Sequence, residues 1–167
     1  MHGHLFLDMA MIRRKHILGL LAVLLALACV ASIYAPIRFD KERDVRELAV
    51  KRRLVGIRQA EERYRKAHGT YASDFKQLVS GGYLADSLRL IPFSDGKEFS
   101  LTVTTQIGKS GRTIPLMECG AMYADYLSGL DENSISNLIE EANEAGKYPG
   151  LKIGDITTPN DNAGNWE

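Results

Sequence analysis

The C-terminal loop carries the side chains whose types and spacing best suit ion binding. Four oxygen donors lie in a glycine-containing stretch: Asp155, Asn160, Asp161 and Asn162. Calcium prefers carboxylate and amide oxygens of this kind, although the spacing is not that of an EF-hand. Asn and Asp also gather in polar loops because their side chains bond to nearby backbone. The stretch therefore predicts either a calcium site or a loop ordered by its own hydrogen bonds.

Trp166 is the only tryptophan. It lies after these oxygen donors and is the second-to-last residue of the sequence. Chain ends usually fray unless they are tied down, whereas a large aromatic ring gains free energy when it is buried. We expect Trp166 to act as a hydrophobic peg that pins the loop onto a sheet. The donors would then be ordered above it, by an ion or by backbone hydrogen bonds.

Three short motifs mimic the acyl-serine set of penicillin-binding proteins: S-x-x-K at 73–76, S-D-G at 94–96 and K-S-G at 109–111. Their spacing is far too short and the second lacks Asn, so we interpret them as a helix cap and two turns. His68 is the only histidine beyond the apolar segment and has no partner at metal-ligand spacing. We therefore predict no catalytic residues, no enzyme and no small-molecule substrate.

Charges balance over the whole chain, with 21 basic and 21 acidic residues, so nothing drives it toward nucleic acid. They are segregated, however. Residues 38–66 hold eleven Lys or Arg against six acids, and residues 113–167 hold two Lys against ten acids. Such a dipole suits head-to-tail association, or it reflects two solvated faces.

An apolar run over residues 17–34 contains no charge and follows Arg13, Arg14 and Lys15. As a helix it would be about 27 Å long, close to the hydrocarbon thickness of a membrane. The positive-inside rule places the basic end in the cytoplasm. We predict a basic cytoplasmic leader over 1–15, an inner-membrane anchor over 16–36 and a periplasmic domain over 37–167.

Two cleaved forms compete with a retained anchor. Residues 26–28 resemble a signal-peptidase site, and Ala28-Cys29 faintly resembles a lipoprotein site with acylation of Cys29. The sequence stays apolar up to Ile37, which favours a retained anchor. Cys29 and Cys119 are the only cysteines; we expect them not to pair, and Cys119 to be buried.

Pro36 should interrupt or kink the helix. Beyond it, apolar residues recur at three- and four-residue steps at Val50, Leu54, Ile57, Ala60, Tyr64 and Ala67. This periodicity predicts an amphipathic helix over 40–67, about 40 Å long, which Gly69 ends. Such a helix needs a surface to pack on, and the rest of the chain must supply it.

The remaining sequence predicts an α+β domain with an antiparallel sheet of about three strands. The expected strands are 88–93 and 98–107, joined by an Asp95-Gly96 turn, and 113–119. Short helices are expected over 74–79, capped by Ser73, over 121–127, and over 132–145, capped by Asp131. Residues 146–167 should be mostly loop.

This layout resembles the type IV pilin-like proteins, most closely the major pseudopilin of type II secretion. The likeness is carried by residues 57–84, where the family has A-x-x-x-Y, then G-x-Y, a short helix with Leu and a G-Y-L-like exit. The matching residues are Ala60, Tyr64, Gly69, Tyr71, Leu78 and 82–84. The C-terminal stretch resembles the family loop that closes on "NW" and holds calcium.

The resemblance implies a non-enzymatic structural component of a pilus-like or type II secretion-like assembly. Its partners would be the inner membrane and either further copies or other pilin-like subunits. Packing and assembly would rest on Leu54, Ile57, Tyr64, Tyr71 and Trp166, with calcium as the only cofactor.

The N-terminal segment departs from the family pattern. Family members are cut after a Gly that precedes an aromatic residue, and they carry Glu at the fifth mature position. Gly19 is the only candidate here, followed by Leu20 and with Leu24 at the fifth place. An uncleaved, membrane-anchored periplasmic binding module with a pilin-like fold is therefore the alternative function.

Overall fold

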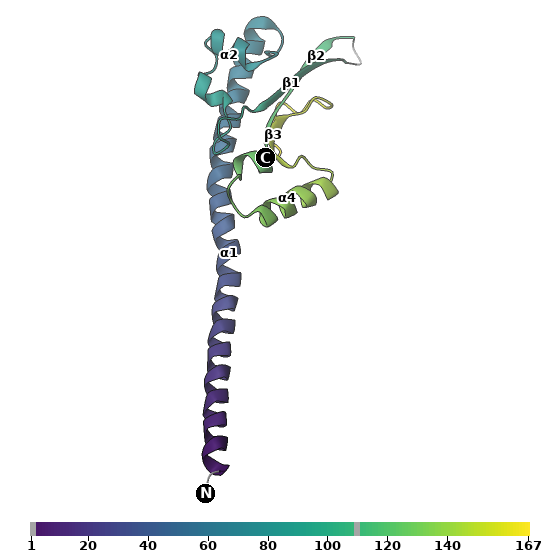
Figure 1. The fold of residues 1–167 in the computed structure, drawn as a ribbon. Helices are drawn as coiled ribbons and strands as arrows, with labels where there is room; N and C mark the ends of the chain where they lie inside the picture. Colours follow the sequence, from purple (N-terminus) through teal and green to yellow (C-terminus); the bar gives the residue numbers. More distant parts are fainter. Residues whose placement is uncertain (1–2, 109–110) are drawn as a thin grey trace. The chain divides into compact units, whose positions relative to one another are not determined.

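The computed structural model describes the backbone of residues 3–108 and 111–167, and the side chains of these residues outside 3–15, 31 and 33–36. Its elements are α1 (Gly3–His68), α2 (Phe75–Ser80), the 3-10 helix η1 (Asp86–Arg89), β1 (Ser100–Ile107), β2 (Thr113–Met122), α3 (Tyr123–Tyr126), α4 (Glu132–Glu144) and β3 (Gly150–Gly154) (Figure 1). Helices combine with one three-stranded antiparallel sheet. The predicted α+β class is confirmed.

The chain divides into two units, Met1–Lys41 and Glu42–Glu167, which are described separately. The first unit is helical and exposes a run of apolar side chains between Ile17 and Val30. Over the part of the chain that the structure describes, no helix combines the length and the apolarity that a membrane crossing requires.

Parts of the predicted N-terminal organisation lie outside the described residues. The leader, 1–15, falls wholly among residues whose side chains are not described, and the anchor, 16–36, does so at residue 31 and residues 33–36. Both stay predictions. The backbone is helical through Pro36, so the predicted interruption is wrong, whereas the alternative, a kink, stays a prediction. A proline removes one backbone hydrogen bond but need not end a helix.

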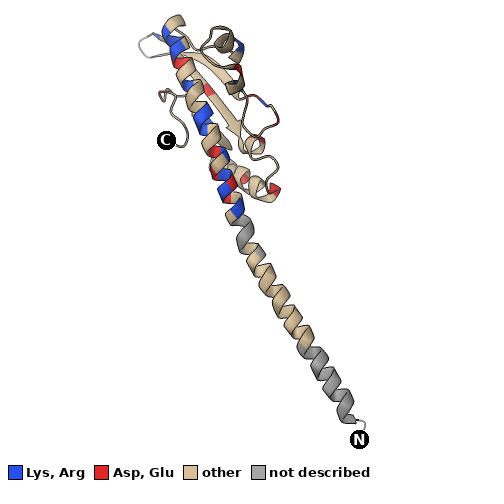
Figure 2. Cartoon of the chain, turned by 90° about the vertical axis from the view of Figure 1, so that its left-hand side faces the viewer, with Lys and Arg blue, Asp and Glu red and all other residues tan. Residues whose placement is uncertain are grey.

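In the second unit, the sheet lies beside the C-terminal part of α1 (Figures 1 and 2). Val50, Leu54, Ile57 and Ala60 are completely buried, as the periodicity predicted. Their burial supplies the main driving force for holding helix and sheet together. The sheet contributes buried apolar side chains of its own, including Met117, Cys119 and Ile153. Cys29 and Cys119 are both free, as expected.

The sheet has the order β1-β2-β3, and its third strand is not the one that the sequence predicted. Asp95 and Gly96 do form a tight turn, with φ angles of 53° and 87°. The preceding segment, however, makes only one bridge, Leu90 with Glu98, because η1 occupies its start and Pro92 has no N–H to donate. The third strand is β3, which lies in the stretch expected to be loop.

The short helices confirm most of the predicted boundaries. Gly69, with φ +79°, follows the last residue of α1. Helix α2 is capped by Asp74 rather than Ser73, because the Asp74 carboxylate accepts a hydrogen bond from Gln77 N–H at 2.9 Å. Asp131 caps α4 through Ser134 N–H at 2.8 Å, as predicted.

Arginines of α1 bind backbone carbonyls in or just after the short helices. Arg46 donates to Tyr126 O at 3.0 Å, at the end of α3, and to Ser128 O at 2.8 Å, beyond it. Arg53 donates to Ser87 O at 3.1 Å and to Leu90 O, at η1. Arg63 donates to Tyr83 O at 2.7 Å, beyond α2. Much of the basic face of α1 (Figure 2) is therefore used within the chain.

Candidate functional site

The four predicted ion ligands lie around one small hollow. Its volume is about 90 Å³, and Asp155, Asn160, Asp161 and Asn162 all line it, together with Tyr71 and Arg65. Asp161 and Asn162 have φ angles of 54° and 56°. Asn and Asp tolerate this left-handed backbone better than most residues, so the tight curvature of the loop follows from their types.

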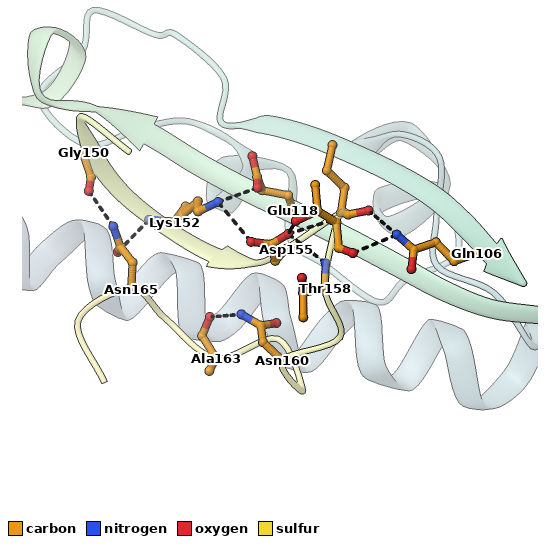
Figure 3. A network of polar contacts seen from close by, with 11 residues as sticks. Gln106, Glu118, Gly150, Lys152, Asp155, Thr158, Asn160, Ala163 and Asn165 are labelled. Carbon is orange, nitrogen blue, oxygen red and sulfur yellow. Dashed lines mark hydrogen bonds and ion pairs between the residues drawn. The ribbon is translucent and has the colours of Figure 1, made fainter. Parts of the chain in front are cut away.

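The Asp155 carboxylate already accepts several hydrogen bonds within the loop. Its Oδ1 receives Thr157 N–H at 2.7 Å, the Thr157 hydroxyl, and Thr158 N–H at 3.1 Å. These bonds, first that of the Thr157 side chain, lower the pKa of Asp155. Its Oδ2 lies 3.8 Å from Lys152 Nζ, which also pairs with Glu118 at 2.7 Å (Figure 3).

The asparagines also bond within the protein. Asn162 is buried and donates from Nδ2 to the Tyr71 hydroxyl at 2.7 Å. Asn160 accepts Ala163 N–H on its backbone carbonyl oxygen at 3.0 Å, whereas Asp161 is exposed. These contacts favour a loop ordered by its own hydrogen bonds. The Arg65 side chain beside the hollow opposes a cation there. The calcium site is therefore the less favoured of the two expectations, and it stays a prediction.

The chain after this loop runs along the outer edge of β3. Gly154 N–H donates to Ala163 O at 3.0 Å, and Gly164 bridges Ile153. Asn165 then acts as a strand residue: its N–H donates to Lys152 O at 3.0 Å, and its side-chain oxygen accepts Lys152 N–H at 3.1 Å (Figure 3). The last residue, Glu167, pairs with Arg58 at 2.9 Å.

Trp166 is half-buried rather than enclosed. Its ring lies against Gly164, where an added Cβ would come within 2.6 Å of the ring. Lys51 Nζ lies 5.9 Å from the ring centre, a cation–π distance. The tail is thus held mainly by its pairing with β3 and by Glu167. This role of Asn165 is not predictable from the sequence, because an amide that replaces backbone groups has no sequence signature of its own.

The remaining packing residues lie near the turn from α1 into α2. Tyr64 stacks on His68, with ring centres 4.2 Å apart, and its hydroxyl donates to Gln77 at 3.1 Å. Tyr71 is 4% exposed and reaches across to Asn162. Leu54 and Ile57 are in the core. Of the motif serines, Ser94 is buried in its turn, where its hydroxyl donates to Ile91 O at 2.7 Å.

Glu61 is a buried acid that the sequence analysis missed. It is 0% exposed; Oε2 accepts Ala72 N–H at 2.9 Å, and Oε1 has no partner among the described residues. Burial raises the pKa of Glu61 to about 7, against the opposing effect of the Ala72 hydrogen bond. The burial of Glu61 could have been predicted from its position, because it lies four residues beyond Ile57 and so on the same face of the helix as the apolar stripe. Cys119 is also fully buried, and burial raises the pKa of its thiol, which favours the unreactive thiol form.

Comparisons of the chain with protein-family models, with curated proteins and with solved structures found no match.

Proposed function

We propose that this chain is a non-enzymatic structural subunit of a pilus-like or type II secretion-like assembly, anchored in the inner membrane. Its partners would be further copies of itself or other pilin-like subunits on the periplasmic side. The proposal combines the resemblance over residues 57–84 with the way those residues are used in the fold.

The observation that carries the proposal is the connection between the helix end and the C-terminal loop. Gly69 turns the chain, Tyr71 follows it into the core, and Leu78 of α2 is completely buried. The Tyr71 hydroxyl then accepts the hydrogen bond from Asn162. The two stretches that resemble pseudopilins thus meet at one contact, as expected if both resemblances reflect one shared fold.

Alkaline extraction of membranes from the native host tests the anchor and the class of protein together. We expect the full chain to stay in the membrane pellet, and we expect mild cross-linking before extraction to give products larger than a dimer. Release into the soluble fraction as a monomer would contradict the proposal. Extraction is informative because alkali removes peripheral proteins but not a spanning helix.

The alternative is an uncleaved, anchored binding module, and Leu24 in place of the family's Glu favours it. Mass spectrometry of the N-terminus of the native protein separates the two. Cleavage after Gly19 would identify a processed subunit and exclude the module. An intact N-terminus together with nothing larger than a dimer in the cross-linking experiment would favour the module.

A further inference from the structure

We propose that β1 pairs edge to edge with β1 of a second copy of this chain, antiparallel and centred on Thr104, so that two three-stranded sheets form one continuous sheet. The proposal uses residues on which the proposed function does not depend. It would hold equally for an assembly subunit and for an anchored module.

The two outer edges of the sheet differ in whether their backbone groups are already hydrogen-bonded. On β3, the outward-facing backbone groups are bonded by the protein's own tail: Gly150 O by Asn165, Lys152 N–H and O by Asn165, and Gly154 N–H by Ala163. This edge therefore offers few groups to a further strand. Covering an edge with another segment is a usual protection against unwanted pairing.

From Leu101 onward, the β1 edge has no such cover among the described residues. Phe99 N–H points away from β2, because it donates to Arg89 O at 3.0 Å. Since backbone groups alternate along an antiparallel strand, those of Leu101, Val103 and Thr105 also point outward. No hydrogen bond within 3–108 or 111–167 reaches them. The β1–β2 hairpin extends beyond β3 (Figure 1).

The β1 sequence lacks the residues that usually keep an edge unpaired. Ser100–Ile107 reads SLTVTTQI, with no charge, proline or glycine, and its register with β2 is continuous, without a bulge. Natural edge strands are protected by just those features. An eight-residue, β-branched, uncharged edge is long enough for stable pairing.

A second copy fits this edge because the strand is self-complementary. When the pairing is centred on Thr104, the outward backbone N–H and C=O of Val103 lie opposite those of Thr105 of the second copy. Leu101 then lies opposite Ile107 of that copy. Ile107 is 81% exposed in the single chain and would gain an apolar neighbour. No like charges oppose each other, and a two-fold arrangement closes without leading to a fibre.

Cysteine cross-linking tests the register directly. In the full chain, in mild detergent and with Cys29→Ser, Thr104→Cys would lie opposite its own copy, with Cβ atoms about 5 Å apart. Thr102→Cys is the matched control: it lies on the same face of the strand, but the two copies would be about 13 Å apart along it. We expect a disulfide-linked dimer from Thr104→Cys and monomer from Thr102→Cys. Equal cross-linking of the two variants, or none, would overturn the proposal.

A backbone variant tests the pairing without a cross-link. Thr105→Pro removes an outward N–H but no hydrogen bond to β2, and its side chain is exposed. Light scattering in detergent should show that Thr105→Pro no longer forms the dimer. Urea unfolding of Thr105→Pro and of the original chain should be the same at a protein concentration where both are monomeric. A dimer that persists in a folded Thr105→Pro, or an original chain that is monomeric at all concentrations, would refute β1 pairing. Neither result would change the membrane-extraction outcome, so failure of this proposal is distinguishable from failure of the proposed function.

Discussion

Glu61 shows how one residue can make the stability of the fold depend on pH. The unfolded chain releases this proton near pH 4.5, whereas the folded chain holds it until about pH 7. Between these values the folded state binds more protons, so its stability falls as pH rises. Above pH 7 the full cost of the buried charge is present, on the order of 3 kcal/mol for a shift of this size.

We predict that Glu61→Gln removes this dependence. Its free energy of unfolding should exceed that of the original chain at pH 8, and the difference should shrink as pH falls toward 5. Urea unfolding at pH 5, 6, 7 and 8 measures it. Glu62→Gln, at the half-exposed neighbouring position, is the control and should leave the slope unchanged. A constant difference between Glu61→Gln and the original chain across this range would count against a buried, protonated Glu61.

At the scale of the elements, the C-terminal loop poses the question of calcium. The Asp155 carboxylate already accepts hydrogen bonds from Thr157 and Thr158, and Ala163 N–H bonds to the backbone carbonyl of Asn160. We therefore predict that calcium and a chelator give melting temperatures within about 2 °C of each other. Trp166, the only tryptophan, reports the transition beside the loop. A site saturated a hundredfold above its Kd would add about 2.7 kcal/mol, so a rise of about 5 °C or more with calcium would show that an ion is bound.

A second prediction at this scale concerns how much the arginine–carbonyl hydrogen bonds of α1 contribute to stability. Arg46→Met keeps the apolar stem but leaves Tyr126 O and Ser128 O without their donor, which we expect to cost about 1–2 kcal/mol. Arg52→Met is the matched control, because Arg52 is exposed and makes no ion pair or hydrogen bond among the described residues. Denaturant unfolding compares the two. Equal stabilities would mean that the carbonyl contacts contribute nothing measurable.

Elements with a strong local signal were predicted from the sequence. The stripe from Val50 to Ala60, the Asp95-Gly96 turn and the Asp131 cap each depend on residues close together in the chain. β3 has only five residues and a glycine at each end, so nothing local distinguishes it from loop. It exists because β2 offers it an edge, which is a tertiary cause.

Only part of the candidate site was predictable from the sequence. Side-chain chemistry identified the four oxygen donors, and the structure does bring them around one hollow. The pairing of Asn165 with Lys152 and the burial of Glu61 depend on contacts distant in sequence. The basic face of α1 was interpreted as solvated or as an association surface, yet Arg46, Arg53 and Arg63 bind carbonyls inside the chain.

At the scale of the whole molecule, the proposed function requires the chain to work within an assembly. The tail already pairs with the outer edge of β3, so only the outer edge of β1 is left for pairing with another chain. Pairing through one edge gives at most a dimer. A larger complex must therefore use other contacts, such as α1 or the acidic surface that includes α4, where Glu132, Glu140 and Glu144 are exposed.

The mass of the complex in its own membrane tests the central claim most directly. The full chain is solubilised from host membranes with a mild detergent and sized by native electrophoresis against the chain carrying Thr105→Pro. We predict a complex larger than a dimer for both, because the assembly does not depend on the β1 edge. Monomers and dimers only, at the native level of expression, would contradict the account of this chain as an assembly subunit.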